Sequence, residues 1–128
     1  MTNFARNVLA GAALLSLAIP GVAMADAQQA IGIAATHAGL AANAANMNVV
    51  RTHLHHVLNC LVGPGGDGFD AMPGNPCAMA GGAIPQEANA EAKTKLLNVA
   101  QQVRTAIGAT DMADAKKVAT ATQDALKK

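Results

Sequence analysis

The sequence is poor in aromatic and charged side chains, which argues against nucleic acid binding. Tryptophan and tyrosine are missing, phenylalanine occurs twice, and charged residues make up only 13% of the chain. Nine basic residues balance eight acidic ones, so no excess of positive charge is present to attract phosphate groups. Phe69, the one aromatic residue after the N-terminal segment, cannot form a base-stacking platform alone. We therefore expect no nucleic acid partner.

The motifs of several catalytic and cofactor-binding classes are also missing. A di-iron or di-manganese helical bundle needs inward-facing glutamates, and residues 26–62 contain no glutamate. Covalent haem attachment needs Cys-x-x-Cys-His, which does not occur. No nucleophile is accompanied by a nearby base and an orienting acid. We expect a binding protein and not an enzyme.

The first 25 residues have the features of an export signal. A positive start at Arg6 precedes a short apolar run over residues 8–19, and the segment ends in the small residues of Ala23-Met24-Ala25. We predict cleavage before Asp26. The apolar run is too short to span a bilayer comfortably, and no second one follows. The mature product, residues 26–128, is therefore expected to be one domain without a membrane span, located in a bacterial periplasm or secreted.

The composition of the mature chain favours helices. Alanine is abundant, β-branched residues are few, and apolar and polar positions do not alternate. The predicted fold class is all-α, an up-and-down four-helix bundle with one long disulfide-tied loop. Apolar periodicity, glycine stops and capping residues place the helices and the loop. The helices are expected over residues 27–44 and 47–62, from Pro85 to the stop at Gly108, and from a cap at Thr110 onward, with a Gly- and Pro-rich loop over residues 63–84.

Two cysteines are placed to fix this loop. Cys60 lies at the end of the second expected helix, and Cys77 lies within the loop. Cysteines of an exported chain usually pair, so we predict a structural disulfide between them. In the chain-entropy model, closing a loop of this size contributes about 3 kcal/mol.

All four histidines lie close together in the sequence, in a stretch without acidic residues. Imidazole nitrogens are common ligands of copper, zinc and nickel. If the chain turns near position 45, antiparallel packing sets His37 level with His53, and His56 follows on the same edge of its helix. On the first helix, the expected apolar face consists of Ile33, His37, Leu40 and Ala44. The predicted metal ligands are His37, His53 and His56, while His55 points to the opposite, solvent-facing side.

Three alternatives compete with this interpretation. Residues 41–48 contain no proline or glycine and could continue one straight helix, which would separate His37 from His53 by about 24 Å. The same histidines could instead hold a non-covalent haem as axial ligands. Finally, the segment from residue 27 to 62 carries one permanent charge, Arg51, and its outer face suits a partner or a homodimer. The protein would then be a metal-free structural or interaction module of the cell envelope.

The histidine-bearing hairpin resembles the histidine-rich small metal-binding proteins of proteobacterial periplasms, which are four-helix bundles. The matching residues are His37, His53, His55 and His56, over about the first third of the mature chain. Members of that group carry many more histidines, and neither the cysteine pair nor the Gly- and Pro-rich loop belongs to their pattern. The resemblance implies periplasmic metal binding and does not extend to high-capacity storage.

Overall fold

The computed structural model describes residues 21–128, with side chains from residue 26 onward. Every regular element in this part of the chain is a helix, which confirms the all-α class. Among these helices, none combines the length and the apolar character that crossing a membrane requires. Most of the expected export signal, residues 1–20, lies outside the described residues. The helices are α1 (Gly21–Asn43), α2 (Met47–Val62), α3 (Ala83–Gln86), α4 (Ala90–Ile107) and α5 (Met112–Leu126).

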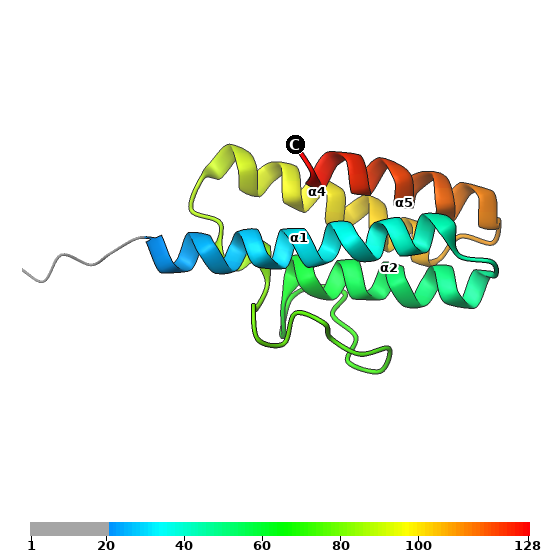
Figure 1. Cartoon of the computed structure of the whole chain (residues 1–128), viewed down its shortest axis with the longest axis horizontal. Coiled ribbons are helices and arrows are strands. Elements are labelled where there is room, and N and C mark those ends of the chain that lie inside the picture. Colours follow the sequence, from blue (N-terminus) through cyan, green and yellow to red (C-terminus); the bar gives the residue numbers. More distant parts are fainter. Residues whose placement is uncertain (1–20) are drawn as a thin grey trace, which may run out of the picture.

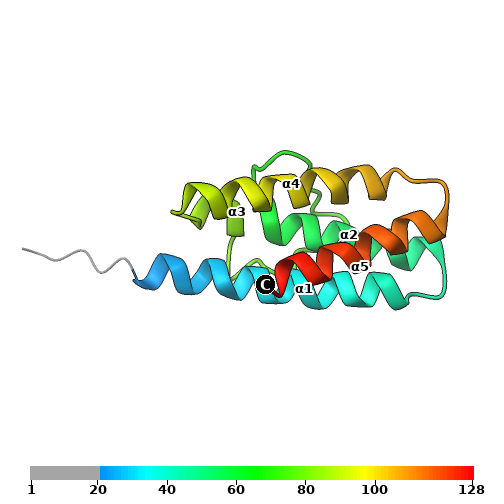
Figure 2. The same ribbon diagram turned by 90° about the horizontal axis from the view of Figure 1, so that it is seen from above.

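The four long helices pack around one core. α1 contacts α2 and α5, while α4 contacts the same two neighbours from the other side. Figure 1 shows α1 and α2 side by side, with α4 and α5 above them and the long loop below α2. The view in Figure 2 shows that the four helix axes run along a common direction. The short α3 closes the end of the loop against α1 and α2.

The chain turns back between α1 and α2, as the hairpin prediction required. α1 ends at Asn43, and Asn46 caps α2 by accepting a hydrogen bond from the backbone N–H of Val49 at 3.1 Å. Lys116 of α5 donates to the carbonyl of Ala44 at 3.0 Å, which satisfies a backbone acceptor in the turn. The alternative of one straight helix is therefore wrong.

Alanines form the contact between α1 and its neighbours. Ala30, Ala34, Ala38 and Ala41 are completely buried. The buried face of α1 is thus rotated by one position from the expected one: Leu40 is 47% exposed, and His37 lies at the edge of the face. On α2 the predicted apolar stripe is confirmed, and it consists of Val50, Leu54, Val57 and Leu61. Small residues on α1 let its backbone lie close to this stripe.

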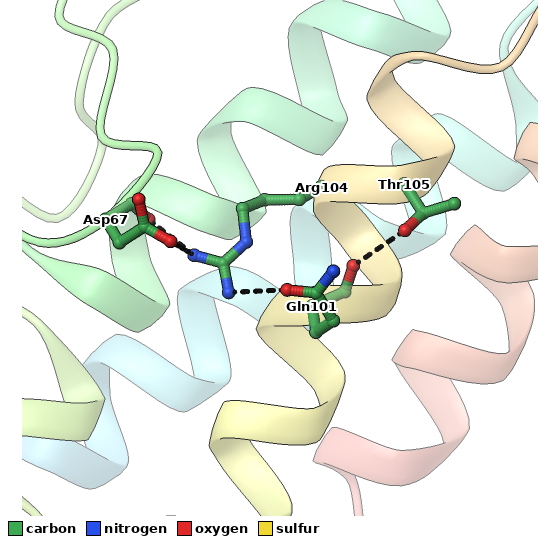
Figure 3. A network of polar contacts seen from close by, with 4 residues as sticks. All are labelled: Asp67, Gln101, Arg104 and Thr105. Atoms are coloured by element: carbon green, nitrogen blue, oxygen red, sulfur yellow. Dashed lines mark hydrogen bonds and ion pairs between the residues drawn. The ribbon is translucent and has the colours of Figure 1, made fainter.

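The loop between α2 and α3 is fixed at several points. Gly63 ends α2 with φ of 70°, a left-handed conformation that favours glycine. The sulfur atoms of Cys60 and Cys77 lie 2.01 Å apart, at disulfide distance, as predicted. Arg104 of α4 binds both the backbone carbonyl and the carboxylate of Asp67, and it also donates to Gln101 (Figure 3). The loop is therefore joined to α2 and to α4.

Two predicted helix starts in the second half of the chain are wrong. Pro85 lies within the short α3, and the long α4 begins five residues later, where Asn89 accepts from the N–H of Ala92. The predicted stop is confirmed, since Gly108 ends α4, with right-handed dihedral angles. Asp111, not Thr110, caps α5 by accepting from the N–H of Asp114. At both helix starts, the side chain of a neighbouring residue accepts a hydrogen bond from the first turn of the helix.

Candidate metal centre

Three histidines from α1 and α2 meet at the edge of the helix interface. The Nδ1 atom of His37 lies 3.0 Å from Nδ1 of His53 and 3.3 Å from Nδ1 of His56. Each residue offers one ligand atom within 4.8 Å of the other two. The rings stand at angles to one another, with centroids 4.7 to 5.6 Å apart. The structure therefore brings together the three residues that were predicted as ligands.

The local sequence explains why these rings converge. His53 and His56 are three residues apart on α2, so they project from nearly the same side of that helix. His37 lies on α1 beside the buried alanine face, and the turn near position 45 sets it level with the other two. All three rings are half-buried. A solute in the surrounding water can reach their edge without unfolding the helix pair.

The spacing of the nitrogen atoms fits one small metal ion. A metal–nitrogen distance of about 2.0 to 2.1 Å in a tetrahedral site puts neighbouring ligand nitrogens about 3.3 Å apart. The two observed Nδ1 separations of His37 are 3.0 and 3.3 Å. Three imidazoles fill three of four tetrahedral positions and leave one for water or another ligand. The histidines thus lie close enough together to bind a metal.

A backbone carbonyl of the loop orients His56. The Nε2 atom of His56 lies 2.6 Å from the carbonyl oxygen of Pro73. Because a carbonyl can only accept, Nε2 must carry the proton, and Nδ1 of the neutral ring then has a free lone pair. That lone pair points toward His37. Metal-binding histidines commonly donate their other N–H to such an acceptor.

The pKa values of two of the histidines favour the form that binds metals. Burial, followed by the neighbouring His56 and His53, lowers the pKa of His37 to about 4. Burial, followed by the charge of His56, also lowers the pKa of His53 below its usual value. A neutral imidazole is the form that coordinates, so protons compete weakly for His37 at neutral pH.

The other two candidate residues in this stretch are not part of the cluster. His55 projects from α2 on the side of Arg51, which donates to the backbone carbonyls of Ile107 and Ala109 at the end of α4. His55 is half-buried and its Nδ1 atom is buried without a hydrogen-bond partner, so the expected exposure to solvent is wrong. Cys60 is bonded to Cys77, and a disulfide sulfur is a poor ligand.

The geometry does not favour the haem alternative. Two axial imidazoles on opposite faces of a porphyrin need ligand nitrogens about 4 Å apart, twice the usual metal–nitrogen distance. The Nδ1 atoms of His37 and His53 lie 3.0 Å apart, with the rings close to each other. A macrocycle has no space between them. A bare ion fits where a haem does not.

The contact with Pro73 could not be predicted from the sequence. It involves a backbone oxygen, which every residue type carries, so no motif marks it. The only available signal was the length of the loop, since long loops in compact domains are functional or fixed to the core. Comparison with known proteins adds no further guide, because no family model, no curated protein and no solved structure matches this chain.

Proposed function

We propose that this protein is exported to the periplasm, or secreted, and binds one transition metal ion through His37, His53 and His56. The observation that carries the proposal is the convergence of the three rings: Nδ1 of His37 lies 3.0 and 3.3 Å from Nδ1 of His53 and His56, and each residue has a ligand atom within 4.8 Å of the other two. The lowered pKa of His37 supports it, because a neutral ligand is ready to bind near pH 7. The resemblance to histidine-rich periplasmic proteins points the same way.

The rest of the fold is consistent with this location. We take α1, α2, α4 and α5 as an up-and-down bundle whose long loop is tied by the bond between Cys60 and Cys77. Disulfides persist in oxidising compartments such as the periplasm, which supports export. The signal-like features of residues 1–25 support it independently.

Binding, and not catalysis, is the role that we infer. Three neutral imidazoles without a carboxylate suit copper, zinc or nickel, and they bring no charge of their own to neutralise the ion. The half-buried position lets an ion enter and leave from the surface. These properties suit the scavenging or transfer of an ion between partners, for which the fourth coordination position is open to a ligand from elsewhere.

The test is metal content and metal affinity of the protein purified from the periplasm without nickel resin. We expect about one copper, zinc or nickel per chain by elemental analysis, and no Soret band in the absorption spectrum. After chelation, titration with Zn²⁺ and Cu²⁺ should restore a single site. Protein that is metal-free as isolated and takes up neither ion would refute the proposal. A dimer that survives chelation in such protein would favour the interaction module.

A further inference from the structure

Asn59 is a buried polar residue on α2, and the hydrogen bonds of its side chain all go to the loop. Its side-chain N–H groups donate to the carbonyl of Asp70 at 2.6 Å and to the carbonyl of Gly74 at 2.9 Å. Its side-chain oxygen accepts from the N–H of Asp70 at 3.0 Å. The side chain is completely buried, so each of these bonds takes the place of a hydrogen bond to water. Asn59 thus fixes both ends of the segment from residue 70 to 74.

One of the residues between these two fixed points contacts the candidate metal centre. Pro73 lies inside the segment held by Asn59, and its carbonyl accepts the hydrogen bond from Nε2 of His56. Gly74, which follows it, has φ of 99°, a conformation that L side chains rarely adopt. The backbone here lies next to the ring of His56: a Cβ atom on Gly74 would be 3.5 Å from Nε2, an ordinary van der Waals contact, so the φ angle and not a lack of space favours glycine.

We infer that Asn59 is a positioning residue for the metal site: by holding the Pro73 carbonyl on His56, it keeps this ring in the tautomer that presents Nδ1 to the ion. The inference rests on the proposed function for its metal, but the hydrogen-bonded chain exists without one. A free imidazole in water favours protonation of Nε2 only weakly, so a fixed acceptor is needed to select one tautomer and one ring orientation.

The loop has another attachment that serves as a matched control. The ion pair between Asp67 and Arg104 holds the beginning of the loop to α4, as Figure 3 shows. Neither Asp67 nor Arg104 forms a hydrogen bond or ion pair with residues 70–74. Removing the ion pair between them loosens the loop without removing the bonds that place the Pro73 carbonyl.

The first test needs no metal. Nitrogen-15 NMR of the metal-free wild-type protein near pH 7.5 should show His56 with a protonated Nε2 and an unprotonated Nδ1. In Asn59→Ala we expect a mixture of both tautomers, while Asp67→Ala should keep the wild-type signal. A wild-type His56 protonated at Nδ1, or one that interconverts freely, would overturn the inference.

The second test uses Zn²⁺ alone, in competition with a chromophoric chelator. Loss of an outer hydrogen bond to a ligating histidine typically weakens metal binding 10- to 100-fold, and we expect a loss of this size in Asn59→Ala. Asp67→Ala should lose less than about threefold, since the Pro73 contact remains. Equal losses in both variants would overturn the inference. If the wild type takes up no zinc, the proposed function fails, and the tautomer measurement alone decides the role of Asn59. If Asn59→Ala does not fold, the tautomer of His56 in the wild-type protein decides it.

Discussion

The two helix pairs of this protein are stabilised in different ways; the first pair is α1 with α2, and the second is α4 with α5. Residues 90–126, which include α4 and α5, carry charges of both signs and no histidine, and their helices have side-chain caps and an i, i+4 ion pair between Glu91 and Lys95. Residues 27–62 carry a single permanent charge and all four histidines. Their helices pack through alanines, and a covalent bond fixes the loop next to them.

The two pairs also differ in the polar side chains that lie at their helix interfaces. Polar groups placed at a helix interface cost stability unless they have partners, and α5 buries one such group, the hydroxyl of Thr122, without a hydrogen-bond partner. The first pair concentrates three imidazoles at its interface, where burial lowers the pKa of two of them. We therefore assign the proposed function to the first pair. The second pair supports it, as Arg51 and Lys116 join the two halves at one end of the bundle.

The largest effect is expected from removing a ligand from the histidine cluster. His53→Ala should weaken Zn²⁺ binding by at least about 100-fold, more than the loss of an outer hydrogen bond, because two imidazoles remain where three converged. His55→Ala provides the control from the same helix, and its affinity should stay within about threefold of the wild type. Isothermal titration or chelator competition measures both. Equal losses in the two variants would contradict the assignment of the faces of α2.

The disulfide provides the next largest effect, since it is a covalent bond that closes the loop next to the first pair. Reduction of the bond between Cys60 and Cys77 should lower stability by about 3 kcal/mol in the chain-entropy model. For a domain of this size, that corresponds to a fall in Tm of roughly 10 to 20 °C. Far-UV circular dichroism should still show a helical protein below the new Tm. An unchanged melting temperature would show that the two thiols are not joined in solution.

Alanine packing next to the histidines should matter to binding, whereas packing in the second pair should matter only to stability. Ala41 is completely buried four residues after His37, on nearly the same side of α1. Ala41→Leu should cost about 1 to 3 kcal/mol by overpacking and should weaken Zn²⁺ binding roughly tenfold by moving His37 away from α2.

Val103 on α4 is the matched position in the other pair. It is also completely buried, and Val103→Ala should cost about 2 kcal/mol through the lost contacts and the cavity. Its zinc affinity should stay near the wild-type value. Unfolding in denaturant and zinc competition, carried out on both variants, separate the two effects. If Val103→Ala weakens binding as much as Ala41→Leu, the site depends on overall stability and not on the local distance between α1 and α2.

How much of the fold could be predicted differs between the same two halves. The bounds of α2 follow from its apolar repeat and from the glycine that ends it, and they were predicted correctly. In α1 about half of the residues are alanine or glycine, so the periodicity that identifies a buried face is weak. The predicted face was therefore wrong by one position: in the structure Leu40 is exposed, and His37 lies at the edge of the buried face. In α4 and α5 several adjacent residues could act as caps, and only the packed structure selects Asn89 and Asp111.

The clustering of the three histidines could be predicted from the sequence, but the contacts that support it could not. The turn near position 45 sets His37 beside His53, and the spacing of three residues adds His56, so sequence arithmetic finds the cluster. The bonds from Asn59 and the carbonyl of Pro73 depend on the path of an irregular loop. Such a path follows from tertiary contacts and has no repeat in the sequence. The burial of the Nδ1 atom of His55 was not predicted either.

The smallest effect concerns acid and the metal-free protein, and it also separates the two halves. The pKa of His37 is about 4 in the folded protein and 6.5 in an unfolded chain, and the pKa of His53 is lowered as well. Above pH 6.5 both states are neutral and the stability is complete. Between pH 6.5 and 4 the unfolded chain binds protons that the folded chain does not, so stability falls as the pH falls; below 4 His37 adds no further loss. Melting temperatures measured across this range should therefore decline in the wild type and decline less in His37→Gln. Since α4 and α5 contain no histidine, the decline arises in the first pair, and a wild-type Tm that is constant from pH 6.5 to 4.5 would show that the imidazoles there are not desolvated.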